Sequence, residues 1–145
     1  MKKLIMMLVM LLMVVTGAMA QADKVCGTYK AVRNGVNSKV KVFKQGNGYR
    51  AQVIWVDNLK MPDGSIRMDV RNPDKSKRNV PADKIVLIDK VTYNAAENIW
   101  EGGKIYDPTS GKEYKVELSF KDGKTLMVKG MWGPFNQKMY WTKIQ

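Results

Sequence analysis

WEGGKIYDPTSGKEY, residues 100–114, contains a strand, a tight turn and the start of a second strand. Asp107 followed by Pro108, with Gly111 three positions on, is typical of a turn. The Asp side chain accepts backbone N–H groups, Pro presets φ and Gly adopts a positive φ. Gly102 and Gly103 interrupt the first strand, and they predict a bulge, a sharp bend or the close approach of another backbone or a ligand. A bend or bulge of the sheet is the simplest of these interpretations.

Segments of alternating polarity, bounded by Gly, Asn, Asp and Pro, continue on both sides of this hairpin. They predict strands at 25–32, 38–44, 49–56, 85–93, 99–106, 113–121, 125–132 and 138–144. In the 49–56 segment, Tyr49 and Trp55 are expected on the same inward face. About eight short strands joined mostly by hairpins favour an all-β, antiparallel up-and-down β-barrel over a sandwich, because a closed barrel has no free edges.

Residues 57–84 interrupt the strand pattern with three prolines, few bulky apolar residues and many charges. A loop of this length in a compact domain is usually functional, a lid or partly disordered. The run Asn72-Pro73-Asp74 predicts a short helix through Lys77, with Pro at its first position. The next strand has apolar residues on both faces, which predicts that this loop covers its outer face.

The N-terminus has the pattern of a secretory signal peptide. Lys2 and Lys3 precede an apolar run over 4–15, and Ala18-Met19-Ala20 forms a small-residue cleavage site. About twelve apolar residues are too few to span roughly 30 Å of hydrocarbon, so no membrane span is expected. We therefore expect a signal peptide at 1–20 and a periplasmic or secreted β-barrel domain at 21–145.

Composition excludes several kinds of chemistry. The chain has one cysteine, Cys26, and no histidine, which excludes an internal disulfide and argues against a zinc site, a Ser-His-Asp triad and a Cys-His pair. No catalytic residue, metal or cofactor is predicted. The formal charge of +12, or +10 without Lys2 and Lys3, attracts anionic glycans, lipid head groups and nucleic acid. The basic residues alternate along the strands, which predicts a solvated exterior and no specific nucleic-acid site.

Three blocks of residues together resemble one exported bacterial family, known as domain of unknown function 2147. They are residues 100–114, the segment Asn72-Pro73-Asp74 with Arg78 and Pro81, and the closing runs 126–130 and 141–143. The resemblance covers essentially the whole mature chain. Val80 and Lys84 depart from it, because a second Arg and a Gly usually stand at these positions, and this weakens an anion-binding role for the loop.

The family's similarity to lipocalins implies an eight-stranded calycin barrel. Gly27-Thr28-Tyr29 occupies the place of the lipocalin Gly-x-Trp motif, with Tyr in place of Trp. Lys143 is placed like the basic residue of the last lipocalin strand that lies across the aromatic ring.

The interior of an eight-stranded barrel is either filled by side chains or holds one small ligand. The candidate ligand-binding aromatics are Tyr29, Tyr49, Trp55, Trp100, Tyr106, Tyr114 and Trp132. A basic lid over the barrel mouth is a second candidate, which would bind a carboxylate, phosphate or acidic glycan through Arg67, Arg71, Lys75, Lys77 and Arg78.

Three functions are compatible with these patterns. The first is non-enzymatic binding of a small amphipathic or anionic ligand by an exported barrel. The second is an envelope protein or glycan interaction module with a filled barrel. The third is an enzyme of unknown type, which the absence of histidine disfavours.

Overall fold

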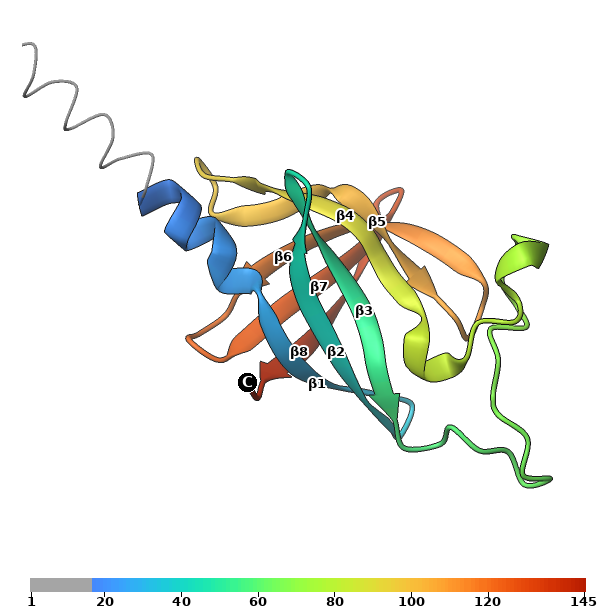
Figure 1. The fold of residues 1–145 in the computed structure, drawn as a ribbon. Coiled ribbons are helices and arrows are strands. Elements are labelled where there is room, and N and C mark those ends of the chain that lie inside the picture. The colour runs from blue at the N-terminus through green and yellow to red at the C-terminus, as the bar shows by residue number, and fades with distance from the viewer. Residues whose placement is uncertain (1–16) are drawn as a thin grey trace, which may run out of the picture.

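The computed structural model describes residues 17–145, so residues 1–16 of the predicted signal peptide lie outside the described residues. Eight antiparallel strands form a closed barrel in which each strand pairs with its sequence neighbours and β8 pairs with β1 (Figure 1). This confirms the predicted fold class. The strands are β1 (Gly27–Arg33), β2 (Val36–Gln45), β3 (Gly48–Val56), β4 (Val86–Asn94), β5 (Ile99–Asp107), β6 (Lys112–Phe120), β7 (Thr125–Trp132) and β8 (Phe135–Lys143).

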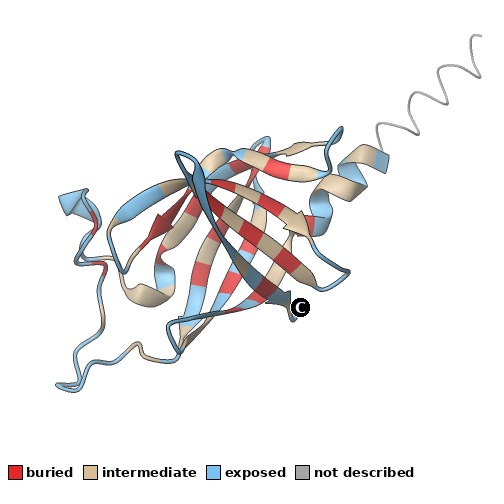
Figure 2. Ribbon diagram, turned by 180° about the vertical axis from the view of Figure 1, so that it is seen from behind, coloured by how far each residue is buried: buried red, intermediate tan, exposed pale blue. Residues whose placement is uncertain are grey.

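Alternation of apolar and polar residues produces the barrel wall. Buried and exposed positions alternate along the strands (Figure 2), because successive side chains point to opposite faces of a sheet. In β6, for example, Val116 and Leu118 are buried while Lys115 is exposed. The inward residues form one continuous core around Trp100, Tyr29, Ile88 and Leu118.

One end of the barrel is closed by the 3-10 helix η1 (Asp23–Val25) and by the seam between β1 and β8. The Tyr29 hydroxyl donates to the Val25 carbonyl oxygen at 2.8 Å, and Lys143 Nζ lies 6.0 Å from the centre of the Tyr29 ring. Lys143 also donates to the Lys24 carbonyl at 2.9 Å. A Cβ on Gly27 would lie 2.6 Å from Lys143 Cε and 2.7 Å from the Gln145 carbonyl oxygen, so this crowded position favours glycine. Lys143 thus crosses the Tyr29 ring as the lipocalin resemblance implies.

The expected inward position of Trp55 is wrong. The pairing of β2 with β3 shifts between Lys39 and Val40, so that Lys39 pairs with Trp55 and Val40 with Val53. The extra residue in β3 reverses the alternation beyond Val53, as β-bulges do. Trp55 is therefore 44% exposed on the outer face, where Lys39 Nζ lies 5.4 Å from its ring centre.

The two adjacent glycines of β5 have different roles. The pairing of β5 with β6 shifts between Trp100 and Gly103, and Gly102 has φ of +85°, which confirms the predicted bulge. A Cβ on Gly103 would lie 1.9 Å from the Lys90 carbonyl oxygen of β4. Gly102 therefore permits the bulge, and Gly103 permits the close approach of the neighbouring backbone.

The long loop between β3 and β4 is held by its own hydrogen bonds and extends away from the barrel (Figure 1). It contains the 3-10 helices η2 (Lys75–Lys77) and η3 (Ala82–Lys84) and the isolated bridges Lys60↔Ile66 and Met68↔Pro81. The predicted helix is the single turn η2. Asp74 caps it by accepting from Ser76 N, so Pro73 precedes the cap and does not begin the helix.

The loop also covers the outer face of β4 at its first residues, as predicted. Val80 and Ala82 pack with Ile85 and Leu87 in a second small cluster around Val53 and Tyr106. Within residues 17–145, no helix has the length and apolar character needed to cross a bilayer.

Replacing Gly103 by Ala is expected to lower the free energy of unfolding by about 2–3 kcal/mol, because overpacking forces backbone shifts of this cost. Urea titration followed by tryptophan fluorescence measures the effect. Gly123→Ala is the control, because a Cβ at Gly123 meets no atom within 4 Å. Equal stability of the two variants would contradict the close backbone approach.

Candidate binding site at the open end of the barrel

The closed half of the barrel interior is filled by aromatic side chains. Trp100 is fully buried, lies 4.9 Å from Tyr93 and 5.7 Å from Phe120 between ring centres, and donates from Nε1 to the Ala22 carbonyl at 3.0 Å. Tyr29 packs against Trp141 with ring centres 6.3 Å apart. This half of the barrel is a packed core.

The opposite, open end contains a cavity of about 190 Å³. Its lining residues are Arg33, Ile105, Tyr106, Asp107, Tyr114, Gly130, Trp132, Gln137 and Met139. The cavity is smaller than the roughly 300–1,000 Å³ of pockets for drug-sized ligands. It therefore suits a molecule smaller than a typical drug.

Gly130 explains why space remains at this end. It follows Leu126 and Val128 on the inward face of β7 and is itself buried. A Cβ added there would lie 3.8 Å from Tyr114 Cβ and 3.9 Å from Ile105 Cγ2, which are ordinary contacts. The cavity is thus the volume that a larger inward side chain at position 130 would occupy.

The cavity lies at the β1–β8 seam, beyond its last paired residues. The two strands pair at Tyr29↔Lys143 and Lys30↔Thr142. Arg33 at the end of β1 and Gln137 and Met139 of β8 line the cavity. The seam is therefore held at the closed end, while the cavity is bounded by side chains at the open end.

The cavity wall combines an apolar part with a few polar groups. Tyr114 and Trp132 pack with ring centres 5.4 Å apart, and Ile105 and Met139 complete the apolar part. Arg33 and the exposed Gln137 supply polar groups at the rim. A few polar groups in an apolar wall are typical of sites that orient a small ligand.

Asp107 holds the Arg33 guanidinium in place at this rim. Its carboxylate accepts from Arg33 at 2.9 Å, from Thr109 N at 3.0 Å and hydroxyl Oγ1 at 2.7 Å, and from the Ser110 hydroxyl at 2.9 Å. Burial acts to raise the pKa of Asp107, but the hydrogen bonds from Thr109 and Ser110 and the Arg33 charge outweigh it and hold this pKa below its ordinary value. The predicted turn role of Asp107 is confirmed, and Gly111 has the expected positive φ of +74°.

The same hairpin anchors the long loop. The Tyr106 hydroxyl donates to Asp69 Oδ1 at 2.7 Å, and Asn72 Nδ2 donates to Asp69 Oδ2 at 2.9 Å. Burial, followed by the Asp69 hydrogen bond, raises the pKa of Tyr106, so its hydroxyl remains a donor. A Cβ on Gly111 would lie 2.2 Å from the Arg71 carbonyl oxygen, so the loop backbone packs directly on the turn.

Asp69 was missed by reasoning from the sequence, although it is 3% exposed and links β5 to the loop. Its neighbours Arg67, Met68 and Val70 give no pattern that distinguishes it. The nearest signal is Asn72-Pro73-Asp74, since Asn72 is its hydrogen-bond partner.

The structure separates the seven candidate aromatics into three groups. Tyr106, Tyr114 and Trp132 lie together around the cavity. Tyr29, Tyr49 and Trp100 are buried at the closed end, where the Tyr49 hydroxyl donates to Asp23 Oδ1 at 2.5 Å. Trp55 lies on the outer face. Only the first group is positioned to contact a molecule in the cavity.

The cations of the predicted basic lid do not converge on the mouth cavity. Arg67 donates to the Asn58 carbonyl at 3.1 Å, Arg78 to the Asn72 carbonyl at 2.8 Å, and Arg71 to the Thr109 carbonyl. These three arginines hold the loop together through backbone oxygens. The side chains of Lys75 and Lys77 are exposed, and Lys77 lines a different cleft.

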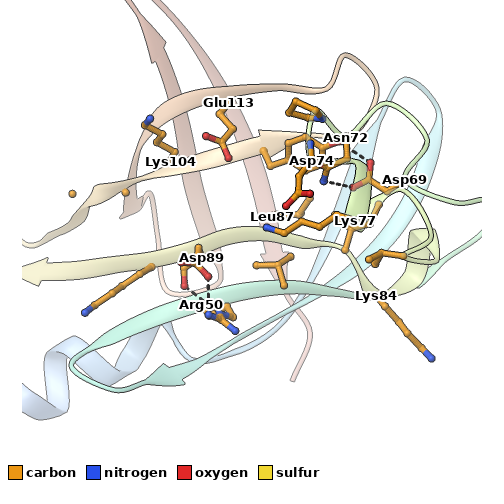
Figure 3. A pocket seen from close by; sticks show the side chains of 18 residues that line it. Arg50, Asp69, Asn72, Asp74, Lys77, Lys84, Leu87, Asp89, Lys104 and Glu113 are labelled. Carbon is orange, nitrogen blue, oxygen red and sulfur yellow. Dashed lines mark hydrogen bonds and ion pairs between the residues drawn. The ribbon is translucent and has the colours of Figure 1, made fainter.

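That second cleft is a groove of about 810 Å³ on the outer wall, between the long loop and strands β4 and β5 (Figure 3). Charged groups of both signs line it, including Asp74, Lys77, Lys104 and Glu113. The Arg50–Asp89 ion pair, 2.7 Å long, lies at its side. Apolar side chains, including Val80, Ile85 and Leu87, also line it, so the groove presents charged and apolar surface side by side. Within residues 17–145, no group of three or more His, Cys, Asp or Glu side chains is placed to hold a metal ion.

The closed eight-stranded antiparallel barrel, with an N-terminal 3-10 helix at one end and a small cavity at the other, is a lipocalin-like fold. Residues 27–143 match the family DUF2147, described as an uncharacterized protein conserved in bacteria, and the chain belongs to this family. A similar solved structure is protein HP1028 from the human pathogen Helicobacter pylori, which is described as belonging to the lipocalin family. The two share 24% identity over 83% of this chain and 82% of that chain, with a TM-score of 0.66, which shows a shared fold. No curated protein sequence matches.

Replacing Asp107 by Ala is expected to lower the free energy of unfolding by about 3 kcal/mol, because several hydrogen bonds to a buried carboxylate are lost. Arg33→Ala is the control and is expected to cost about 1 kcal/mol or less, since its side chain is 41% exposed. Urea unfolding at neutral pH compares them. Equal losses would contradict the central role of the carboxylate.

The stability that Asp107 contributes is expected to depend on pH. Its native pKa lies below the ordinary value of 3.8, so the ionised form is favoured by folding. The advantage of the wild-type protein over Asp107→Asn is therefore complete above that value and is lost as the pH falls through the depressed native pKa. Urea unfolding of both proteins from neutral to strongly acidic pH measures it, and an advantage that grows on acidification would contradict the assignment.

Proposed function

We propose that this protein is an exported, non-enzymatic barrel that binds a small amphipathic ligand in the cavity at its open end. The observation that carries the proposal is the unfilled space beside Gly130, bounded by Tyr114 and Trp132 and reached by Arg33 at the rim. An apolar body of the ligand would pack on the aromatic wall. The Arg33 guanidinium has five N–H donors, and its hydrogen bond to Asp107 leaves donors free for an acceptor-bearing head group.

A second candidate is an interaction module whose barrel serves as a scaffold, and the outer groove favours it. Asn72, Pro73 and Asp74 of one family block and Gly102, Gly103 and Lys104 of another line this groove together. Its mixed donors and acceptors suit a glycan or a polar protein segment of the envelope. Native mass spectrometry of protein isolated from its own host separates the candidates: a co-purifying small molecule supports the cavity, and an empty barrel supports the groove.

The cavity proposal is tested with Gly130→Leu and with octanoate as the probe, a molecule sized to the cavity. The added side chain should occupy the cavity and weaken octanoate binding about tenfold or more, which corresponds to at least 1.4 kcal/mol. Gly123→Leu is the matched control, because it places the same side chain in open space at the closed end. Isothermal titration measures the affinity, and Gly130→Ala provides a graded variant should the leucine disturb folding.

The head-group preference is part of the same test. Octanoate should bind more tightly than octanol, and octylammonium should bind most weakly, because Arg33 donates and carries positive charge. Unchanged octanoate affinity in both Gly130 variants would refute the cavity as the site. Equal affinity for all three probes would refute the role of Arg33.

Export is tested by the mass of the protein recovered from the periplasm or medium of a bacterial expression host. The expected mature chain begins at Gln21. Cleavage there keeps the contacts that hold the N-terminal segment, from Trp100 Nε1 to the Ala22 carbonyl and from Gln21 Nε2 to Asn98 Oδ1 at 3.1 Å. Recovery of the intact 145-residue chain from the cytosol alone would contradict export.

A further inference from the structure

The acidic residues of the barrel wall are distributed unevenly among the eight strands. Strands β7, β8, β1, β2 and β3 are consecutive in the closed sheet and contain no Asp or Glu. We call these five strands the basic wall; its cations are Lys30, Arg33, Lys39, Lys41, Lys44, Arg50, Lys129, Lys138 and Lys143. The acidic residues of the other three strands are Asp89, Glu101, Asp107, Glu113 and Glu117. Closure of the barrel brings the acid-free N- and C-terminal strands together, so their alternating, solvated basic residues form one continuous wall without acidic residues.

Acidic residues from outside the basic wall neutralise only some of these cations. The ion pairs are Arg33–Asp107, Lys44–Asp23, Arg50–Asp89 and Lys129–Glu117. The central lysines Lys30, Lys39, Lys41 and Lys138 are exposed and form no ion pair with any residue in the described range 17–145. The middle of the wall therefore carries uncompensated positive charge.

The register of the sheet also places like charges opposite one another. Lys30 pairs with Lys39 across β1 and β2, and Lys129 pairs with Lys138 across β7 and β8. Directly opposed like charges destabilise a sheet. An external anionic surface would relieve this repulsion.

Exposed apolar side chains lie where the same strands reach the open end. Val32 precedes Arg33, the last residue of β1, Trp55 lies near the end of β3, and Trp132 and Phe135 flank the β7–β8 turn. Their side chains are 58%, 44%, 44% and 63% exposed, respectively. We call these four residues the apolar rim. Trp132 and Phe135 have ring centres 6.3 Å apart, and Trp55 stacks with Lys39 of the basic wall.

We propose that the basic wall and the apolar rim dock this protein on an anionic lipid surface with the open end of the barrel toward the lipid. Each Lys or Arg near such a surface contributes about 1 kcal/mol, and Trp and other aromatic side chains favour the boundary between head groups and hydrocarbon. The cavity and the open part of the β1–β8 seam then face the bilayer, from which an amphipathic ligand can enter. The docking goes beyond the proposed function, because it does not require a ligand in the cavity.

A lipid surface fits this face better than a nucleic acid does. Proteins that bind single strands present a basic groove that follows the phosphate backbone. Lys30, Lys39, Lys41 and Lys138 line neither the mouth cavity nor the outer groove. The wall is the convex outside of a barrel, and its apolar rim includes Val32, which has no stacking face.

The test measures binding of the chain from Gln21 onward, which contains every strand, to vesicles of phosphatidylcholine with or without phosphatidylglycerol. Sedimentation gives the affinity, and a blue shift of tryptophan fluorescence reports burial of Trp55 and Trp132. The protein should bind the vesicles that contain phosphatidylglycerol, and more weakly as salt increases. The triple variant Lys30→Gln, Lys39→Gln, Lys138→Gln should bind about a hundredfold more weakly, which corresponds to about 1 kcal/mol at each of three positions.

The matched control is Lys84→Gln, Lys90→Gln, Lys104→Gln, which removes the same charge from exposed positions off the basic wall. It should change vesicle affinity less than a few-fold. Equal losses in both triple variants, absence of binding to phosphatidylglycerol vesicles, or tighter binding to a DNA fragment than to vesicles would overturn the proposal. Gly130→Leu should bind vesicles like the wild-type protein, so the docking and the cavity proposal can fail independently.

Discussion

The structure depends on the short pairing between β1 and β8 that closes the barrel. The two strands pair at only two positions, and the Lys143 side chain, lying across the Tyr29 ring, secures them from one side. Glycine is favoured at position 27 because a Cβ would lie 2.7 Å from the Gln145 carbonyl oxygen and because φ there is +151°. Closure is thus concentrated at the end covered by η1. The opposite part of the seam is left to side chains, and the cavity lies there.

Two glycines of the barrel wall, Gly103 in β5 and Gly130 in β7, have opposite surroundings. Gly103 lets the Lys90 carbonyl of the β4 backbone come close to β5. Gly130 leaves an inward position without a side chain near the open end, and the cavity occupies this position. The contrast lies in backbone geometry: at Gly103 a Cβ has no room, whereas at Gly130 it has ordinary contacts. Gly130 therefore leaves the cavity unfilled, although the backbone at this position would accept a larger residue.

The fold could be predicted from the sequence because it rests on local patterns. Period-two alternation, hairpin turns and the DPTSG turn of residues 107–111 specify strands and their connections without knowledge of distant contacts. The position of Trp55 could not be predicted, since one extra residue in β3 reverses the alternation and leaves no mark in composition. Asp69 was missed for a related reason: its burial depends on Tyr106, which lies in another strand. The charge asymmetry needs the barrel to be closed, because it joins the first three strands to the last two.

Residues 100–114 are the most strongly patterned stretch, and their main role is to position other residues of the candidate site. Asp107 orients Arg33, and Tyr106 holds the loop through Asp69, so both work through hydrogen bonds that are already satisfied. Groups that remain free to meet another molecule are found on the terminal strands, as Gln137 and the unpaired central lysines of the basic wall. These strands have regular alternation and few turn motifs, so their sequence contains no motif that indicates a binding surface. Sequence motifs are most specific where the backbone requires particular residues, as in turns and bulges. A binding surface requires only suitable exposed side chains on regular strands, and it therefore leaves no such motif.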